Sequence, residues 1–424
     1  MWMESGESGH TTRYVALCIL GLLLVSLLFP ALDGLNAVGF LSDKTYLLIL
    51  QDNGELRDTG GTISCMGLLT MRDGAVKGLQ VWYSSTGQTN AIVRIHEPQS
   101  FIWFFGTENV KLYAANVQYD FASFAPFMMS SFYNVTGRHV DGIIAVDFTA
   151  LKEFLKLTGP ISVSDNILTS RNVADIMYYY SVQSKDELTN LLSELGLAIA
   201  RTIQDSSLPL KVAFFSTARQ LVSEKHLQFY VPGDSGDFIQ RAFGGTSIPP
   251  QADFVSVVDY NLGAGKADPG IHRSIDSHVE ILANGSTISR LTVTWTNNDW
   301  WDYNVFTTVL IPAKAEVTEA SHHAQTFEGP LKARGPDFTA LSARVVVPAN
   351  GTCSVTYTYT QPRNVHGNGL GQHYDLYIQK QAGIDAYTLD AAVQLPTGAT
   401  FIRSENVGAE QVVTGDTHVQ AVYM

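Results

Sequence analysis

The hydrophobic pattern of the chain changes near residue 250, and this change constrains the fold more than any other sequence feature. Between Lys44 and Gly245, runs typical of buried strands alternate with runs at helical spacing. The five apolar residues that start at Tyr46 are typical of a strand buried on both faces. Strands separated by helices indicate an α/β layered domain, which we predict over residues 44–249.

Two helix starts in this domain carry capping signals. Asp147 follows an apolar run and suits an N-cap, and Gly159 with Pro160 suits the end of the same helix. Ser184 and Glu187 have the spacing of a capping box before a leucine-rich helix.

After residue 250 the sequence is almost entirely strand-like. Runs with alternating or β-branched residues occupy residues 288–295, 305–311, 343–347 and 354–359. Turn signals such as Asn350-Gly351 separate such runs. Short strands at this spacing predict an all-β antiparallel sandwich over residues 250–424.

Residues 14–31 form an uncharged apolar run of 18 residues. At 1.5 Å per residue this run is just long enough to cross a hydrocarbon core of ~30 Å. A cleavable signal peptide is the alternative, although its apolar part is usually shorter and precedes a small-residue cleavage site. We expect a cytoplasmic stub at residues 1–13, a transmembrane signal anchor at residues 14–31, and the bulk of the chain outside the cytoplasmic membrane.

Composition and sequons fit this location. The net charge of −13 excludes a typical nucleic-acid binder, which presents a basic face to phosphates. Three sequons in turn-like context predict glycosylation, as in an extracellular glycoprotein, at Asn134, Asn284 and Asn350. Cys65 and Cys353 lie in different predicted domains, so we expect two buried free thiols.

The densest polar cluster directly follows the first predicted strand and contains Asp52, Asn53, Glu55 and Arg57. Ligand sites of α/β sheets form beyond the carboxyl ends of strands. A guanidinium binds phosphate bidentately and carboxylates hold Mg²⁺, so these residues are our candidate ligand-binding site. The alternative is an internal pair of Arg57 with Glu55 beside a tight turn at Gly60-Gly61.

Two further segments have competing interpretations. Residues 263–266 read Gly-x-Gly-Lys, but the spacing differs from that of a phosphate loop, and we expect an interdomain turn with Lys266 near an acidic partner. The aromatic residues Trp295, Trp300, Trp301 and Tyr303 suit either sugar stacking or packing within the sandwich.

Four segments together resemble the domain of unknown function 4012 family, whose members are prokaryotic envelope proteins with one amino-terminal transmembrane helix. These segments are YLLILQDNGELRDTGGTI (46–63), HVDGIIAVDFTALKEFLKLTGPISV (139–163), DFVSVVDYNLGAGKAD (253–268) and YIQKQAG (377–383). The family's first segment more usually has Asn at the position of Asp52. No reaction is established for the family, so the resemblance implies an envelope location without a chemistry.

The order of segments over residues 46–205 is also distantly similar to the LytR-CpsA-Psr phosphotransferases. These enzymes transfer glycopolymers from polyprenyl pyrophosphate lipids with Mg²⁺ and arginines, and Asp52 and Arg57 resemble their first motif. Their Pro-Arg-Asp motif has no match after Trp82. We therefore expect an envelope protein that binds a surface polymer or a partner protein, with a Mg²⁺-dependent glycopolymer transferase as the alternative.

Overall fold

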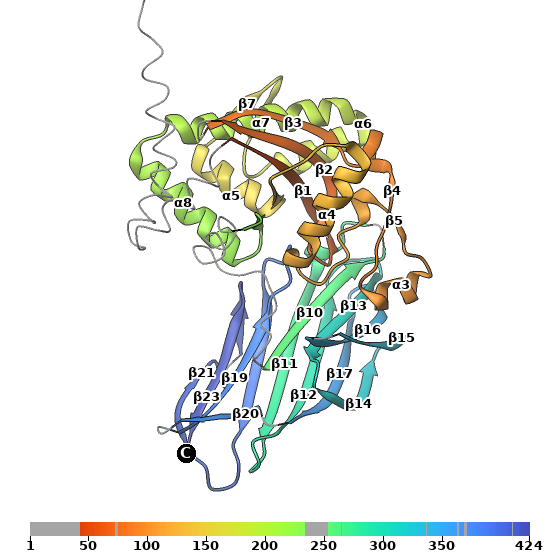
Figure 1. Ribbon diagram of the computed structural model, residues 1–424, viewed down its shortest axis with the longest axis vertical. Coiled ribbons are helices and arrows are strands. Elements are labelled where there is room, and N and C mark those ends of the chain that lie inside the picture. Colours follow the sequence, from red (N-terminus) through yellow and green to blue (C-terminus); the bar gives the residue numbers. More distant parts are fainter. Residues whose placement is uncertain are drawn as a thin grey trace, which may run out of the picture.

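The computed structural model describes residues 43–72, 75–233, 253–263, 265–335, 337–362, 364–368, 371–408 and 410–424. The predicted stub, the anchor at residues 14–31 and the predicted boundary between residues 249 and 250 lie outside these ranges. Within them, no helix has the length and apolar character needed to cross a membrane. The described chain consists of a mixed α/β region up to residue 233 and an all-β region from residue 253, called here the α/β region and the β region (Figure 1).

A mixed sheet forms the centre of the α/β region. Its described strands have the order β3-β2-β1-β6-β9. Their bounds are β1 (Lys44–Arg57), β2 (Gly60–Arg72), β3 (Ala75–Tyr83), β6 (Gly142–Asp147) and β9 (Leu227–Tyr230). β6 is parallel to β1, whereas every other neighbouring pair in this sheet is antiparallel.

Helices cover both faces of this sheet. The longer helices are α4 (Phe121–Thr136), α5 (Phe148–Thr158), α6 (Val173–Gln183), α7 (Lys185–Asp205) and α8 (Leu208–Ser223). α4 packs on one face, and α5 to α8 pack on the other (Figure 1). The predicted caps are confirmed, because Asp147 accepts a hydrogen bond from the Ala150 amide at 2.9 Å and Ser184 accepts one from the Glu187 amide at 3.3 Å.

Several short elements lie at the edges of the α/β region. They are the 3₁₀ helices η1 (Gly87–Asn90) and η2 (Leu112–Ala114), the helix α3 (Gln99–Phe105), and the hairpins β4 (Ile92–Arg94) with β5 (Asn109–Lys111) and β7 (Ile161–Val163) with β8 (Asn166–Leu168). α3 contacts the β region, where the ring of Phe104 stacks on that of Phe306 with centroids 4.5 Å apart.

Two sheets form the β region, in addition to the 3₁₀ helix η3 (Asp268–Gly270). The first contains, in spatial order, β15 (Thr326–Arg334), β16 (Phe338–Val347), β13 (Tyr303–Pro312), β10 (Asp253–Asn261), β19 (Gly371–Gln379), β23 (Thr417–Tyr423) and β21 (Phe401–Glu405), with β18 (His366–Asn368) beside β19. The second contains β14 (Glu316–His323), β17 (Thr352–Gln361), β12 (Thr287–Asn297), β11 (Ile271–Ile281), β20 (Tyr387–Gln394) and β22 (Gln411–Val413).

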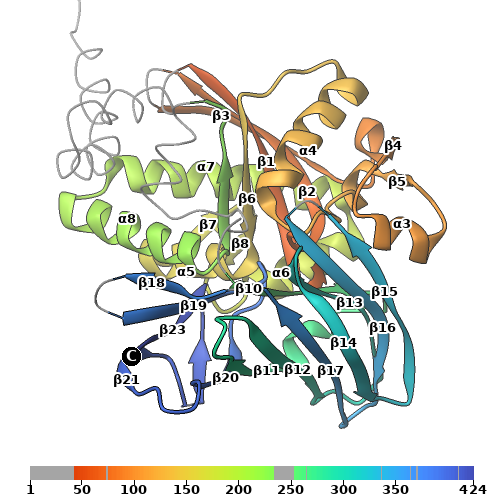
Figure 2. The same cartoon turned by 60° about the horizontal axis from the view of Figure 1, so that its bottom comes forward.

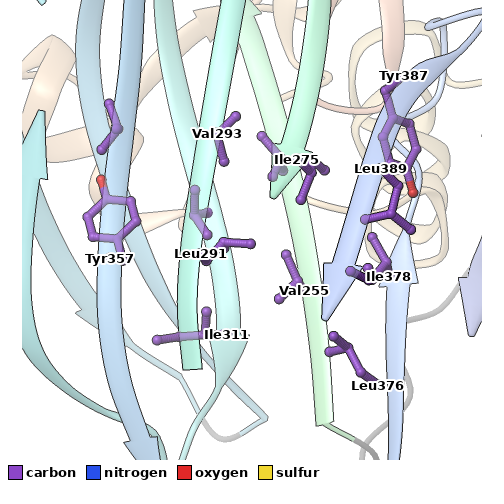
Figure 3. Packing of buried hydrophobic residues seen from close by; sticks show 14 of the residues in the cluster. Val255, Ile275, Leu291, Val293, Ile311, Tyr357, Leu376, Ile378, Tyr387 and Leu389 are labelled. Carbon is purple, nitrogen blue, oxygen red and sulfur yellow. The ribbon is translucent and has the colours of Figure 1, made fainter. Parts of the chain in front are cut away.

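The two sheets share one apolar core. Side chains from both sheets, such as Val255, Ile275, Leu291 and Leu376, belong to a single buried cluster (Figure 3). Alternation of buried and exposed positions along these strands produces this arrangement, as their sequence pattern predicts. The predicted antiparallel pairing is wrong at two places, because β10 pairs with β19 and β11 with β20 in parallel.

The two regions contact each other through the end of β1. This strand contacts η3 and β10. β10 is part of the β region, which lies below the α/β region in Figure 1, and Figure 2 shows the same arrangement after a turn. The polar segment that we predicted as a ligand site therefore lies where the two regions meet.

Candidate functional site

The four predicted site residues lie within β1 rather than in a loop after it. β1 continues beyond the apolar run to Arg57, and its register with β2 shifts between Leu50 and Gln51 and again between Asp52 and Leu56. Bulges of this kind bend a strand and redirect its side chains. A Cβ on Gly61 would lie 2.2 Å from the backbone carbonyl of Asp52. The close approach of β2 to β1 at this position therefore requires glycine.

Arg57 points into the protein and contacts the β region. Its Nη2 is 2.5 Å from Glu55 Oε1, and its Nη1 donates to the carbonyl of Asn261 at 3.1 Å. The guanidinium also lies over the ring of Tyr260, 4.4 Å from its centroid. The internal pair that we kept as the alternative interpretation is therefore present, and its cation holds β1 against β10.

The remaining polar atoms of this segment also have partners inside the protein. Asp52 accepts a hydrogen bond from the Gly54 amide and forms an ion pair with Lys266 at 2.5 Å. The predicted acidic partner of Lys266 is thus Asp52, and the carboxylate at this position forms an ion pair that an asparagine would lack. Asn53 donates to Thr149 Oγ1 at 3.1 Å and to the carbonyl of Gly383 at 3.2 Å.

Asp268 receives three hydrogen bonds at the same contact. The donors are the Leu56 amide at 2.9 Å, Asn261 Nδ2 at 2.7 Å and the Tyr303 hydroxyl at 2.7 Å. Burial raises the pKa of Asp268 to about 6, and these three donors oppose the rise by stabilising the carboxylate.

The Gln381 side chain connects three segments with one amide. Its oxygen accepts from the Asp259 amide at 2.9 Å and from Arg273 Nη2 at 2.8 Å. Its nitrogen donates to the carbonyls of Asp259 at 2.7 Å and of Arg57 at 3.1 Å. We call the contacts among residues 52–57, 147–149, 259–268 and 379–385 the joint. The four segments that carry the family resemblance all contribute to it.

A second group of polar contacts links the joint to His226, which no sequence signal singled out. His226 Nδ1 lies 2.6 Å from Asp147 Oδ2, and its Nε2 lies 3.5 Å from Asp385 Oδ1. Thr149 Oγ1 donates to the same Asp385 oxygen at 3.0 Å. Asp147 therefore caps α5 with one oxygen and binds His226 with the other.

Two buried lysines, Lys225 and Lys380, lie next to these polar contacts. Lys225 forms an ion pair with Asp416 at 2.7 Å and donates to the carbonyl of Lys380 at 2.9 Å. Lys380 Nζ donates to the carbonyls of Glu224 at 2.7 Å and Gln381 at 3.3 Å. Burial, together with the nearby charge of Lys225, lowers the pKa of Lys380 to about 7.

The buried Lys380 predicts a pH dependence of stability. Below about pH 7 both the folded and unfolded states hold its proton, whereas between about pH 7 and 10.5 the unfolded chain holds more protons. The free energy of unfolding should therefore rise with pH in this window, with a slope of up to ~1.4 kcal/mol per pH unit from this group. In urea unfolding from pH 7.5 to 9.5, Lys380→Met should remove that slope, and the exposed control Lys156→Met should keep it. Equal slopes for both variants would contradict the assignment.

A cleft of about 540 Å³ lies beside the joint, between the end of α8 and the last strands of the β region. We call it the interregion cleft. Its lining residues are Val222, Ser223, Lys225, Tyr377, Asn406, Gln411, Val412, Val413, Thr414, Gly415, Asp416 and Thr417. Most of these supply hydroxyl, amide or backbone groups. The paired charges of Lys225 and Asp416 connect this cleft to Lys380 in the joint.

The other predicted residues are dispersed. Trp295 and Tyr303 are buried in the β region, whereas Trp300 and Trp301 are exposed, so the four aromatics form no single surface. Asn284 and Asn350 are exposed beside strand ends, but Asn134 lies within α4 and not in the turn that we predicted. Cys65 and Cys353 are both buried and free, as predicted.

The joint offers no fit for Mg²⁺. Asp52 already binds Lys266 and the Gly54 amide, and Glu55 binds Arg57, so neither carboxylate is free to act as a ligand. Within the described ranges, no group of three His, Cys, Asp or Glu side chains is placed to hold a metal ion.

Solved structures that resemble this chain include three bacterial proteins of low sequence identity. The gbs0355 protein of Streptococcus agalactiae is 13% identical, with 49% of this chain and 75% of that chain covered and a TM-score of 0.34. The transcriptional regulator yvhJ of Bacillus subtilis is 10% identical, with coverages of 49% and 79% and a TM-score of 0.28. The Lin1025 protein of Listeria innocua is 12% identical, with coverages of 52% and 88% and a TM-score of 0.28.

No curated protein matches the chain. Residues 42–180, which include the first two resemblance segments and end within α6, match the family model described as "Protein of unknown function (DUF4012)". The resemblance to this family, whose function is unknown, is therefore confirmed over residues 42–180.

Proposed function

We propose that the protein is an envelope component, anchored in the cytoplasmic membrane by residues 14–31, that binds a surface polymer outside the cell. The observation that carries the proposal is the use of the predicted site residues in the joint. Arg57 is bound to Glu55 and to the carbonyl of Asn261, and Asp52 is bound to Lys266. These side chains hold together the two regions that line the interregion cleft, which is the site of binding in this proposal.

The transferase alternative requires charges that face a pyrophosphate. Developing negative charge in phosphoryl transfer is stabilised by cations aimed at it in a preorganised site. Arg57 is directed to partners within the chain, and Arg94 forms an exposed pair with Glu108. This distribution favours binding over transfer.

The interregion cleft is the binding site that we propose for the polymer. Its volume of about 540 Å³ lies within the ~300–1,000 Å³ range of small-molecule sites. Lys225 and Asp416 neutralise each other, so the lining suits a hydroxyl-rich chain such as a polysaccharide. Because both regions supply lining residues, the joint also fixes the shape of this cleft.

The test is a titration of the full-length protein in detergent micelles with polysaccharide fragments of the envelope. Val412 lines the cleft and is 73% exposed, so Val412→Trp adds bulk there with little effect on folding. We expect this variant to bind about tenfold more weakly. The control Val182→Trp, at a 65% exposed position on α6 outside the cleft, should bind like the wild type.

Three outcomes would overturn the proposal. Equal binding of the polysaccharide by both variants would show that the polymer does not bind in the interregion cleft. Capture of a protein without any polysaccharide binding would favour the partner-protein alternative. Cleavage of polyprenyl pyrophosphate by the protein in the presence of Mg²⁺ would support the transferase alternative.

A further inference from the structure

A second hollow lies at the outer edge of the five-stranded sheet and shares no lining residue with the interregion cleft. We call it the edge hollow, and its volume is about 220 Å³. Its lining comes from β3, from η1 with the residue before it, and from the end of α4. The residues are Gln80, Trp82, Thr86, Gly87, Gln88, Thr89, Phe132, Thr136 and Arg138.

An aromatic pair forms the apolar part of the edge hollow. Gln80 and Trp82 are two residues apart on β3, so their side chains lie on the same face of this edge strand. The ring of Trp82 stacks on that of Phe132, with centroids 6.2 Å apart and an angle of 20° between the planes. Phe132 is fully buried and therefore holds the partly exposed Trp82 ring in place.

Three polar side chains of the edge hollow are available to a ligand. Gln80, Gln88 and Arg138 are exposed, and their side chains make no hydrogen bond or ion pair with any other residue that the structure describes. By contrast, the Thr136 hydroxyl donates to the carbonyl of Phe132 at 2.7 Å, and that of Thr89 donates to the carbonyl of Thr86 at 2.9 Å. The amides and the guanidinium, rather than these hydroxyls, are the groups that can bind a ligand.

The charge of the edge hollow is positive and uncompensated. Arg138 is the charged residue among those lining it, and the lining contains no acid. A guanidinium matches a carboxylate with two parallel hydrogen bonds. The volume is below the ~300 Å³ at which sites for drug-sized ligands begin, so it suits one ring of a longer chain.

We propose that the edge hollow binds one acidic sugar unit, with the ring against Trp82 and the carboxylate on Arg138. This inference rests on the proposed function, because it names the chemical class of polymer that the protein recognises. An apolar wall with a few convergent polar groups is the usual composition of such sites. Gln80 and Gln88 then bind the hydroxyls of the same unit.

The experiment measures binding of digalacturonate, and of digalactose as its neutral counterpart, to the full-length protein by calorimetry. The protein is produced without glycosylation, so that no glycan on Asn134 of α4 competes with the added sugars. We expect the acidic disaccharide to bind at least about tenfold more tightly than the neutral one. Arg138→Gln should abolish this preference. The control Arg171→Gln, at an exposed arginine outside the hollow, should preserve it.

The outcomes distinguish failure of the acidic-sugar site from failure of the proposed polymer site in the interregion cleft. If Arg138→Gln keeps the preference, or if the two disaccharides bind equally, the acidic-sugar site is wrong even when Val412→Trp weakens polymer binding. If Arg138→Gln abolishes the preference while Val412→Trp has no effect, the edge hollow stands and the cleft fails. If the wild type binds neither disaccharide at millimolar concentration, the edge-hollow site is rejected.

Discussion

Replacing Arg57 with methionine is expected to lower the free energy of unfolding by about 3 kcal/mol, near the lower end of the cost of breaking a buried ion pair. The side chains of Arg57 and Glu55 are 11% and 18% exposed, so the variant would leave the Glu55 carboxylate largely buried without its cation. It would also remove the hydrogen bond to the carbonyl of Asn261 and the contact with the Tyr260 ring.

Urea unfolding of the Arg57→Met variant tests this expectation against a matched ion pair. Arg94 and Glu108 are 64% and 40% exposed, so Arg94→Met should cost less than ~1 kcal/mol. The double variant Arg57→Met with Glu55→Gln should recover part of the loss, because it removes the unpaired charge. If Arg57→Met costs no more than Arg94→Met, Arg57 does not stabilise the joint.

The elements with local signals are the ones that the sequence predicts well. The caps at Asp147 and Ser184 bind amides three residues away, so a short stretch of sequence contains both partners. The strands of the β region likewise show alternation that reports their buried faces, as in β12.

Other elements have no comparable local signal. The stretch at Phe121 forms α4, which contains Pro126. Its buried apolar residues pack on the sheet and on neighbouring elements, whereas the apolar Tyr133 is exposed, so the apolar pattern is not confined to one face. Strand directions, such as the parallel pairing of β11 with β20, depend on contacts between distant segments. No period in a single strand encodes its direction.

The contacts of the joint also could not be predicted from local sequence. Its residues were recognisable as a polar cluster, but their partners are far away along the chain. Lys266 is 214 residues from Asp52, and Gly383 is 330 residues from Asn53. His226 follows Lys225, and Lys380 and Gln381 belong to the polar run of the fourth resemblance segment, but no local pattern indicates what these side chains contact. The prediction that residues 52–57 bind a ligand stays a prediction.

Loss of the buried Asp259 carboxylate is expected to have a large effect on the stability of the β region. Asp259 Oδ2 accepts hydrogen bonds from Arg273 Nη2 and, at 2.7 Å, from Trp295 Nε1. The side chains of Arg273 and Asp259 are only 5% and 2% exposed. Asp259→Ala should therefore lower the free energy of unfolding by about 3–5 kcal/mol, because it leaves a guanidinium charge in the core without a counter-ion.

A double variant distinguishes the cost of an unpaired charge from the loss of packing around it. Asp259→Leu with Arg273→Met removes both charges, and replacement of a buried ion pair by apolar residues is often neutral. We expect urea unfolding to show the double variant at least ~2 kcal/mol more stable than Asp259→Ala. The control Asp276→Ala removes a carboxylate that is 50% exposed beside His278, and it should cost less than ~1 kcal/mol. If the double variant is as unstable as Asp259→Ala, the loss comes from the Gln381 and Trp295 contacts, and the ion pair is a minor contributor to the joint.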